Sequence, residues 1–102
     1  MPTNFPVSEY VRTQLQICGK SQKQIAEEAG FPSPNILTMI KQGLTKVPIA
    51  RANQLADAMG VSKMQFMVRV LDEYHPEIIE AMEEAWEGLT LRDVLAQTRH
   101  QR

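Results

Sequence analysis

The sequence predicts an all-α fold: a bundle of five helices over residues 8–73, followed by a helical extension at the C-terminus. Three observations lead to this prediction. Apolar residues recur at spacings of three and four along most of the chain, which places them on one face of a helix. Residues typical of N-caps precede these segments and glycines follow most of them. No stretch alternates β-branched and polar residues over the length of a strand, so no sheet is expected.

The first two helices are delimited by serines and glycines. Ser8 is the expected N-cap of the first helix, which Gly19 ends. Ser21 is expected to cap the second helix in a capping box with Gln24, and Gly30 ends that helix. The side chains expected to face inward are Val11, Leu15 and Cys18 in the first helix and Ile25, Ala26 and Ala29 in the second.

The third and fourth helices begin at prolines. Ser33 and Pro34 are the expected N-cap and first-turn residue of the third helix, which Gly43 ends. Pro48 begins the fourth helix, which ends at Gly60. The expected inward face of the fourth helix is Ile49, Ala52, Leu55, Ala56 and Met59.

The fifth helix has the strongest start signal. Ser62 and Gln65 have the spacing of a capping box, and Val61 is placed to pack against Phe66 as a hydrophobic staple. The apolar face of this helix continues through Met67, Val70 and Leu71.

The character of the chain changes at His75, so we expect two parts, residues 1–74 and residues 75–102. The second part contains an acidic amphipathic helix over residues 76–87, a short helix that starts at Thr90, and a polar tail. Its apolar residues are Ile78, Ile79, Met82, Ala85, Trp86, Leu91, Val94 and Leu95. These side chains either close the core of the first part or meet the same surface of a second chain.

Charge is divided unevenly along the chain. The net charge is −1, but residues 1–63 carry seven Lys and Arg against four acids, and residues 64–102 carry four Arg against eight acids. A front half of charge +3 and a back half of −4 allow one face of the protein to meet phosphate groups.

Several classes of protein are not expected from the composition. No apolar run approaches the roughly 20 residues that span a bilayer, and the N-terminus lacks the features of a secretory signal. One cysteine, Cys18, excludes an intramolecular disulfide and a multi-cysteine zinc site, and it is expected to be a small buried hydrophobe. We therefore expect a cytoplasmic protein.

Catalytic and cofactor-binding patterns are also missing. His75 and His100 are far apart in the sequence and have no partner at metal-ligand spacing. The glutamates between residues 77 and 87 are typical of a solvated helix face rather than of paired catalytic carboxylates. With no glycine-rich phosphate loop and no nucleophile–base pattern, we expect no enzyme, no cofactor and no small-molecule effector.

Taken in order, residues 8–73 resemble the helix-turn-helix domain of the Cro and lambda-repressor type, the XRE-like regulators. The resemblance rests on Ser21-Gln22 before Ile25-Ala26, on Gly30, on the Leu37, Ile40 and Gly43 spacing, and on Pro48, Leu55-Ala56 and Met59-Gly60-Val61-Ser62. The run PNILTMIKQGLTKVP also resembles small regulators associated with phages and mobile elements. The resemblance implies a lambda-repressor-like bundle that places its third helix in the major groove of DNA while the second crosses the backbone.

The third helix departs from the family in one respect, because the stretch from Gly30 to Gly43 is one residue longer. Two registers are therefore open: either Leu37 and Ile40 or Ile36 and Met39 face inward. The spacing to Gly43 favours the first register. The side chains then expected to contact bases are Asn35, Ile36, Thr38, Met39 and Gln42, because amides and hydroxyls bond base edges and apolar groups contact thymine methyls.

Contacts to the DNA backbone are expected from residues around this helix, namely Gln22, Ser33, Lys41, Thr45 and Lys46. The resemblance also implies a homodimer on an inverted-repeat operator, with dimerisation through Ile78, Ile79, Met82, Trp86, Leu91, Val94 and Leu95. We thus expect a transcriptional repressor that lies at the nucleoid when it is bound to DNA. The alternative is an antitoxin-like or phage-encoded interaction module that uses the acidic C-terminal helices, with DNA binding secondary or absent.

Overall fold

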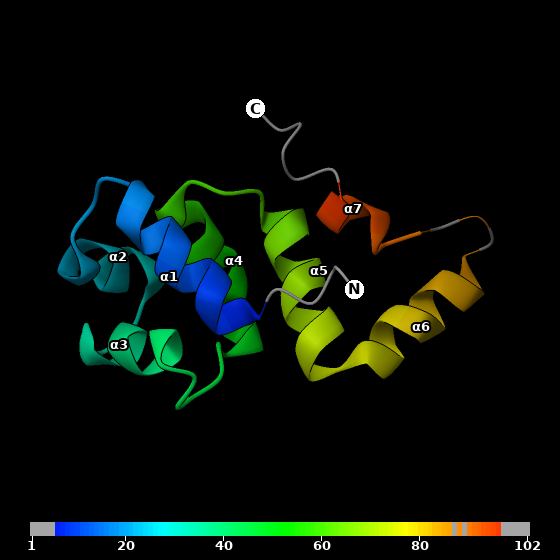
Figure 1. Ribbon diagram of the computed structural model, residues 1–102, viewed down its shortest axis with the longest axis horizontal. Helices are drawn as coiled ribbons and strands as arrows, with labels where there is room; N and C mark the ends of the chain where they lie inside the picture. The colour runs from blue at the N-terminus through cyan, green and yellow to red at the C-terminus, as the bar shows by residue number, and fades with distance from the viewer. Residues whose placement is uncertain (1–5, 87, 89, 97–102) are drawn as a thin grey trace.

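The computed structural model describes residues 6–86, 88 and 90–96, so the polar tail with His100 lies outside the described residues, as does Glu87. The described part is all-helical, without strands, and has seven helices (Figure 1). Their bounds are α1 Val7–Ile17, α2 Gln22–Ala29, α3 Asn35–Lys41, α4 Ile49–Met59, α5 Lys63–Tyr74, α6 Pro76–Ala85 and α7 Asp93–Ala96. The all-α prediction is confirmed. Helices α1–α4 gather on one side of α5, and α6 and α7 lie on its other side (Figure 1).

Helix α1 begins one residue before the predicted cap. Pro6 occupies the N-cap position and has no capping side chain, so the prediction that Ser8 caps this helix is wrong. The free N–H group of Val7 instead donates to the Glu73 carboxylate at 2.7 Å. A carboxylate at a helix N-terminus satisfies an orphan donor and complements the helix dipole. Glu73, which is 66 residues further along the chain, therefore caps α1 in place of a residue near the start of the helix.

Helix α2 starts and ends at the predicted residues. The Ser21 hydroxyl accepts the N–H of Gln24 at 3.1 Å, and Gly30 ends the helix in the left-handed conformation with φ of 80°. The Gln24 side chain donates to Glu28 rather than back to Ser21, so only half of the predicted capping box forms. Glu28 also accepts from Lys20, and these hydrogen bonds lower the pKa of this carboxyl.

Helix α3 adopts the favoured register, with Leu37 and Ile40 buried. Pro34 precedes it in a helical conformation, and the Ser33 hydroxyl accepts the N–H of Asn35 at 3.3 Å. At its other end the backbone turns through Gly43, and two N–H groups beyond the helix bond carbonyls of its last turn. This is the Schellman arrangement, which satisfies carbonyls that the helix leaves without partners.

Helices α4 and α5 follow their predicted starts closely. Ile49 was expected to face inward, but its side chain is 40% exposed, so that prediction is wrong. In α5 the Ser62 hydroxyl accepts the N–H of Gln65, as predicted. The Gln65 side chain does not complete the box; it is buried, and its amide nitrogen has no hydrogen-bond partner.

The buried residues form two separate clusters on opposite sides of α5. The main core comprises Val7, Tyr10, Val11, Ile25, Ala26, Ala29, Leu37, Ile40, Val47, Ala52, Leu55, Ala56, Ala58, Met59, Phe66 and Val70. The second cluster comprises Val68, Ile79, Leu91 and Leu95. Helix α5 contributes to both, because successive residues of a helix point in different directions. The extension therefore packs on α5 and does not close the main core.

We predict that Gly30→Ala destabilises the protein more than Gly60→Ala. Both glycines have positive φ, where an L side chain costs about 1–2 kcal/mol. A Cβ at Gly30 would also lie 3.0 Å from Nη1 of Arg51, whereas nothing lies within 4 Å of one at Gly60. Urea denaturation of both variants measures the difference. Equal losses of stability in the two variants would show that the contact with Arg51 adds no cost. Arg51→Ala in the Gly30→Ala background should remove the additional destabilisation.

We predict that Ile79→Ala lowers the free energy of unfolding by about 2–4 kcal/mol, because it leaves a cavity in the second cluster. Its neighbour Ile78 is 39% exposed, so Ile78→Ala should change stability by less than about 1 kcal/mol. Urea denaturation of dilute protein, followed by circular dichroism, compares the matched pair. Similar losses in both variants would show that α6 is not anchored through Ile79.

Candidate nucleic-acid interface

The outer face of α3 presents polar side chains. Asn35 and Gln42 are exposed, and Thr38 and Met39 are half-buried. Ile36 is half-buried and packs against the main core, so it is less available to a ligand than the other four. The Asn35 amide lies 3.8 Å from the Met39 sulfur, a weak contact that leaves its other donor and its oxygen available.

A hydrogen bond joins α3 to the start of α2. The Gln22 side chain donates through Nε2 to the Thr38 hydroxyl at 3.1 Å. A side-chain amide carries two N–H groups and an acceptor oxygen, so Gln22 keeps one donor after making this bond. Gln22, which was expected to contact the DNA backbone, and Thr38, which was expected to contact bases, are thus adjacent.

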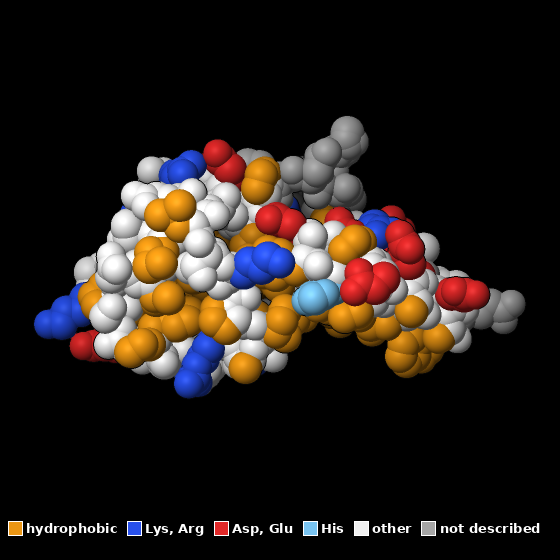
Figure 2. Space-filling view, turned by 90° about the horizontal axis from the view of Figure 1, so that it is seen from below, with side chains coloured by type: hydrophobic (Ala, Val, Ile, Leu, Met, Phe, Trp, Pro, Cys, Tyr) orange, Lys and Arg blue, Asp and Glu red, His pale blue; other side chains and the backbone are white. Residues whose placement is uncertain are grey.

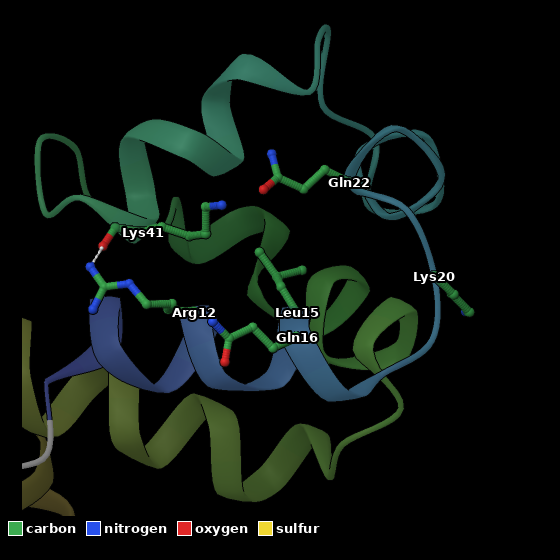
Figure 3. A pocket seen from close by; sticks show the side chains of 6 residues that line it. All are labelled: Arg12, Leu15, Gln16, Lys20, Gln22 and Lys41. Atoms are coloured by element: carbon green, nitrogen blue, oxygen red, sulfur yellow. Dashed lines mark hydrogen bonds between the residues drawn. The ribbon is translucent and has the colours of Figure 1, made fainter.

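Beside this bond the surface is hollowed between α1, α2 and α3. The hollow has a volume of about 200 Å³ and is lined by Arg12, Leu15, Gln16, Lys20, Gln22 and Lys41 (Figure 3). Three of these side chains are cationic and none is acidic. Lys41 and Gln22 were expected at a phosphate contact, whereas Arg12, Leu15, Gln16 and Lys20 were not singled out by sequence reasoning. These four residues lie on α1 and in the turn after it, and only the fold brings them next to Gln22 of α2 and Lys41 of α3.

Arg12 ties α1 to the last turn of α3. Its guanidinium donates through Nη2 to the backbone carbonyl of Lys41 at 2.8 Å, and Nη1 lies 3.2 Å from the Glu9 carboxylate. The Lys41 side chain leaves this contact and extends across the hollow (Figure 3). No hydrogen bond or ion pair engages its ammonium group within the residues that the structure describes.

The loop between α3 and α4 is fixed to the end of α5. The N–H of Val47 donates to the Tyr74 hydroxyl at 3.0 Å, and the Lys46 ammonium lies 5.1 Å from the centre of the Tyr74 ring. Partial burial raises the pKa of the Tyr74 hydroxyl. Of the remaining residues expected at the DNA backbone, Thr45 is half-buried beside this anchor and Ser33 is exposed at the start of α3.

Negative charge lies at the other end of the molecule. Figure 2 shows Asp and Glu side chains gathered over α6, whereas Lys and Arg are spread over the rest of the visible face. Arg92 lies among three acids: it bonds Asp72 on α5 through Nε, and its guanidinium lies within 4 Å of Glu80 and Glu83 on α6. These partners raise the pKa of Arg92. The ion pairs hold α5, α6 and the start of α7 together.

The apolar residues of the extension divide into two sets. Ile79, Leu91 and Leu95 are buried within the chain, and Met82 and Val94 pack against them. Ile78 and Trp86 are instead 39% and 57% exposed. Of the predicted dimerisation set, only these two large side chains are exposed.

Comparison with protein-family models, with curated proteins and with solved structures finds no match. Across the described residues, no helix combines the length and the hydropathy needed to cross a membrane. Within the same residues, no group of three or more His, Cys, Asp and Glu is placed to hold a metal ion.

Proposed function

We propose that this protein is a sequence-specific DNA-binding regulator, a homodimeric repressor of the helix-turn-helix type that inserts α3 into the major groove. One observation carries the proposal: Leu37 and Ile40 anchor α3 in the core, while Asn35 and Gln42 on its other side are exposed. We place the protein in the cytoplasm, at the nucleoid when it is bound.

The dimensions of α3 suit this role. An α-helix with its side chains is about 10–12 Å in diameter, which fits a major groove about 12 Å wide. Asn35 lies at the N-terminus of α3, the end that meets base edges in helix-turn-helix complexes. Its amide matches the donor and acceptor that adenine offers in the major groove.

Contacts that position the protein come from the residues around α3. Lys46 is exposed on a loop held by Tyr74, so its charge is presented from a fixed backbone. Gln22 begins α2, where free N–H groups favour an anion. Contacts of this type add affinity without distinguishing sequences.

A second copy of the chain supplies the affinity that a weakly charged monomer lacks. Two half-sites one helical turn apart, about 34 Å, bind a dimer far more tightly than a single domain. The exposed Ile78 and Trp86 on the extension are the surface that we assign to this contact. Repression then follows because a dimer on its operator excludes polymerase.

A second candidate function uses the same extension differently. Ile78 and Trp86 border an acidic helix, which is the character of a surface that captures a basic partner protein. In that case α3 contributes little, and the protein is an antitoxin-like or phage-encoded interaction module.

We predict that Asn35→Ala and Gln42→Ala change which bases are preferred, whereas Lys46→Ala weakens binding to all sequences alike. Base contacts specify and phosphate contacts position, and a lost base contact costs about 1–3 kcal/mol. Selection of bound duplexes from a random pool by the wild type, followed by binding measurements on the variants, tests this. If no duplex binds the wild type even at low salt, the regulator proposal fails.

We predict that Ile78→Asp or Trp86→Ala shifts the protein from dimer to monomer in sedimentation equilibrium. An aspartate would place an unpaired charge in the contact, and Trp86 supplies most of its area. Met64 is similarly exposed but lies on α5, so Met64→Asp is the matched control and should leave the mass unchanged. A wild-type protein that stays monomeric at high concentration would favour the interaction module instead.

A further inference from the structure

We propose that the outward face of α6 docks on the C-terminal end of α3 of a second copy of this chain, and that this contact covers the outer face of α3 in the free protein. The contact follows from the apolar and charged groups that the two surfaces present. Only its consequence rests on the proposed function, because covering α3 excludes DNA only if α3 is the helix that enters the groove.

The outward face of α6 carries an apolar row beside an acidic row. The apolar row consists of exposed residues spaced by three and four positions, Ile78, Ala81 and Ala85. The acidic row has the same spacing and is also exposed, and it consists of Glu77, Glu80 and Glu84. Trp86 follows as the C-cap residue and is 57% exposed. Figure 2 shows acidic and hydrophobic side chains together over this helix.

This face of α6 points away from the rest of its own chain. Ile79, on the opposite side of the helix, is buried in the second cluster, and α6 lies across α5 from α1–α4 (Figure 1). Its charges are only partly compensated: Arg92 lies 3.9 Å from Glu80, and within the described residues no cation pairs with Glu84. Of the residues that the structure describes, none is placed to cover this face, and we assign it to another molecule.

The C-terminal end of α3 offers complementary groups. The N–H of Leu44 donates to the Met39 carbonyl at 2.9 Å, which holds Leu44 against the last turn of α3. The Leu44 side chain is still 69% exposed. Lys41 and Lys46 flank Leu44 in the sequence, and neither ammonium group pairs with a carboxylate within the described part of the chain. An exposed apolar side chain between two such cations is complementary to an apolar row beside acids.

Charge favours the contact of α6 with α3 over the contact of α6 with a second α6. In an isologous pair the same patch meets itself, so the glutamates of α6 would face each other, and α6 has no Lys or Arg to separate them. On the end of α3 the same glutamates meet lysines. In the proposed operator complex the duplex would occupy α3 and free α6. Two molecules on adjacent half-sites would then meet at a high effective concentration, which offsets the repulsion between their α6 helices.

The first test is the self-association of Leu44→Asp, with Ile17→Asp as the matched control. Both side chains are 69% exposed. A Cβ at Gly43, next to Leu44, would lie 3.9 Å from the Ser8 hydroxyl near the start of α1, whereas Ile17 lies about 14 Å further along that helix. We expect Leu44→Asp to raise the concentration of half-association about tenfold or more in sedimentation equilibrium, because a carboxylate would replace the apolar contact and face the glutamates of α6. Ile17→Asp should match the wild type. Equal effects of the two variants, or a wild type that stays monomeric, would overturn the inference.

The second test mixes two variants that each keep one half of the contact. Leu44→Asp retains the face of α6, and Ile78→Lys retains the end of α3. We expect each variant alone to be monomeric and an equimolar mixture to associate, because the intact α6 of one variant docks on the intact α3 of the other. A contact between two α6 helices cannot give this result, since Leu44→Asp would then associate alone. A mixture that stays monomeric would overturn the inference.

The third test is the response of the wild type to salt and to DNA. Raising sodium chloride from about 0.1 M to about 1 M shortens the Debye length from about 10 Å to about 3 Å. We expect this to weaken the association, because opposite charges meet in the contact, whereas association between two acidic α6 helices would strengthen. A duplex that carries a single half-site should dissociate the assemblies into complexes of one protein with one duplex. Assemblies that persist with the duplex bound would show that the contact does not cover α3.

The three tests separate this inference from the proposed function. If duplexes bind but Leu44→Asp associates as the wild type does, the contact with α3 is overturned and the regulator proposal stands. If the mixed variants associate but no duplex binds, the regulator proposal fails and the contact stands. If the wild type is monomeric and is captured only by a basic partner protein, the second copy is overturned and the interaction module is favoured.

Discussion

The burial of Leu37 and Ile40 is the constraint on which the rest of the structure depends. Helix α3 has only seven residues and would not be stable alone. Two side chains driven into the core fix both its position and its rotation about its own axis. Because neighbouring residues of a helix are about 100° apart, this rotation decides that Asn35 and Gln42 face outward. The burial of Leu37 and Ile40 thus determines which polar side chains are exposed on the opposite face of α3.

The end of α5 is the second fixed point. Glu73 accepts the N–H of Val7 at the start of α1, and the adjacent Tyr74 accepts the N–H of Val47 in the loop after α3. Two segments distant in sequence are therefore held by neighbouring residues. The extension leaves α5 directly beyond them, at His75. A change in the packing of α6 on α5 would act on residues next to both contacts, which gives the extension a physical connection to the loop that carries Lys46.

Local signals predicted most of the fold, and long-range contacts account for the rest. Ser21, Ser62 and the glycines after α2, α3 and α4 act within one turn of chain, so their roles follow from spacing alone. Ser8 was misplaced because the cap of α1 comes from Glu73 at the far end of the domain. The same distinction applies to the candidate site. The polar face of α3 was predicted from periodicity, but the hydrogen bond from Arg12 to the Lys41 carbonyl depends on the packing of α1 against α3. No pattern within the sequence of α1 distinguishes Arg12 from any other exposed cation.

Under the proposed function, the acidic extension would limit how a duplex can approach. Carboxylates over α6 repel phosphates, and Arg92 offsets only part of this charge because its ion pairs are already made with Asp72 and the glutamates of α6. A duplex bound at α3 as we propose would therefore be favoured when it runs away from α6, and this would orient the protein on DNA. The exposed Ile78 and Trp86 then remain free of the duplex and available to a second chain. In the proposed complex, repulsion by the acids of α6 and attraction by the cations near α3 would act in the same direction, so the small net charge of −1 is compatible with an oriented encounter.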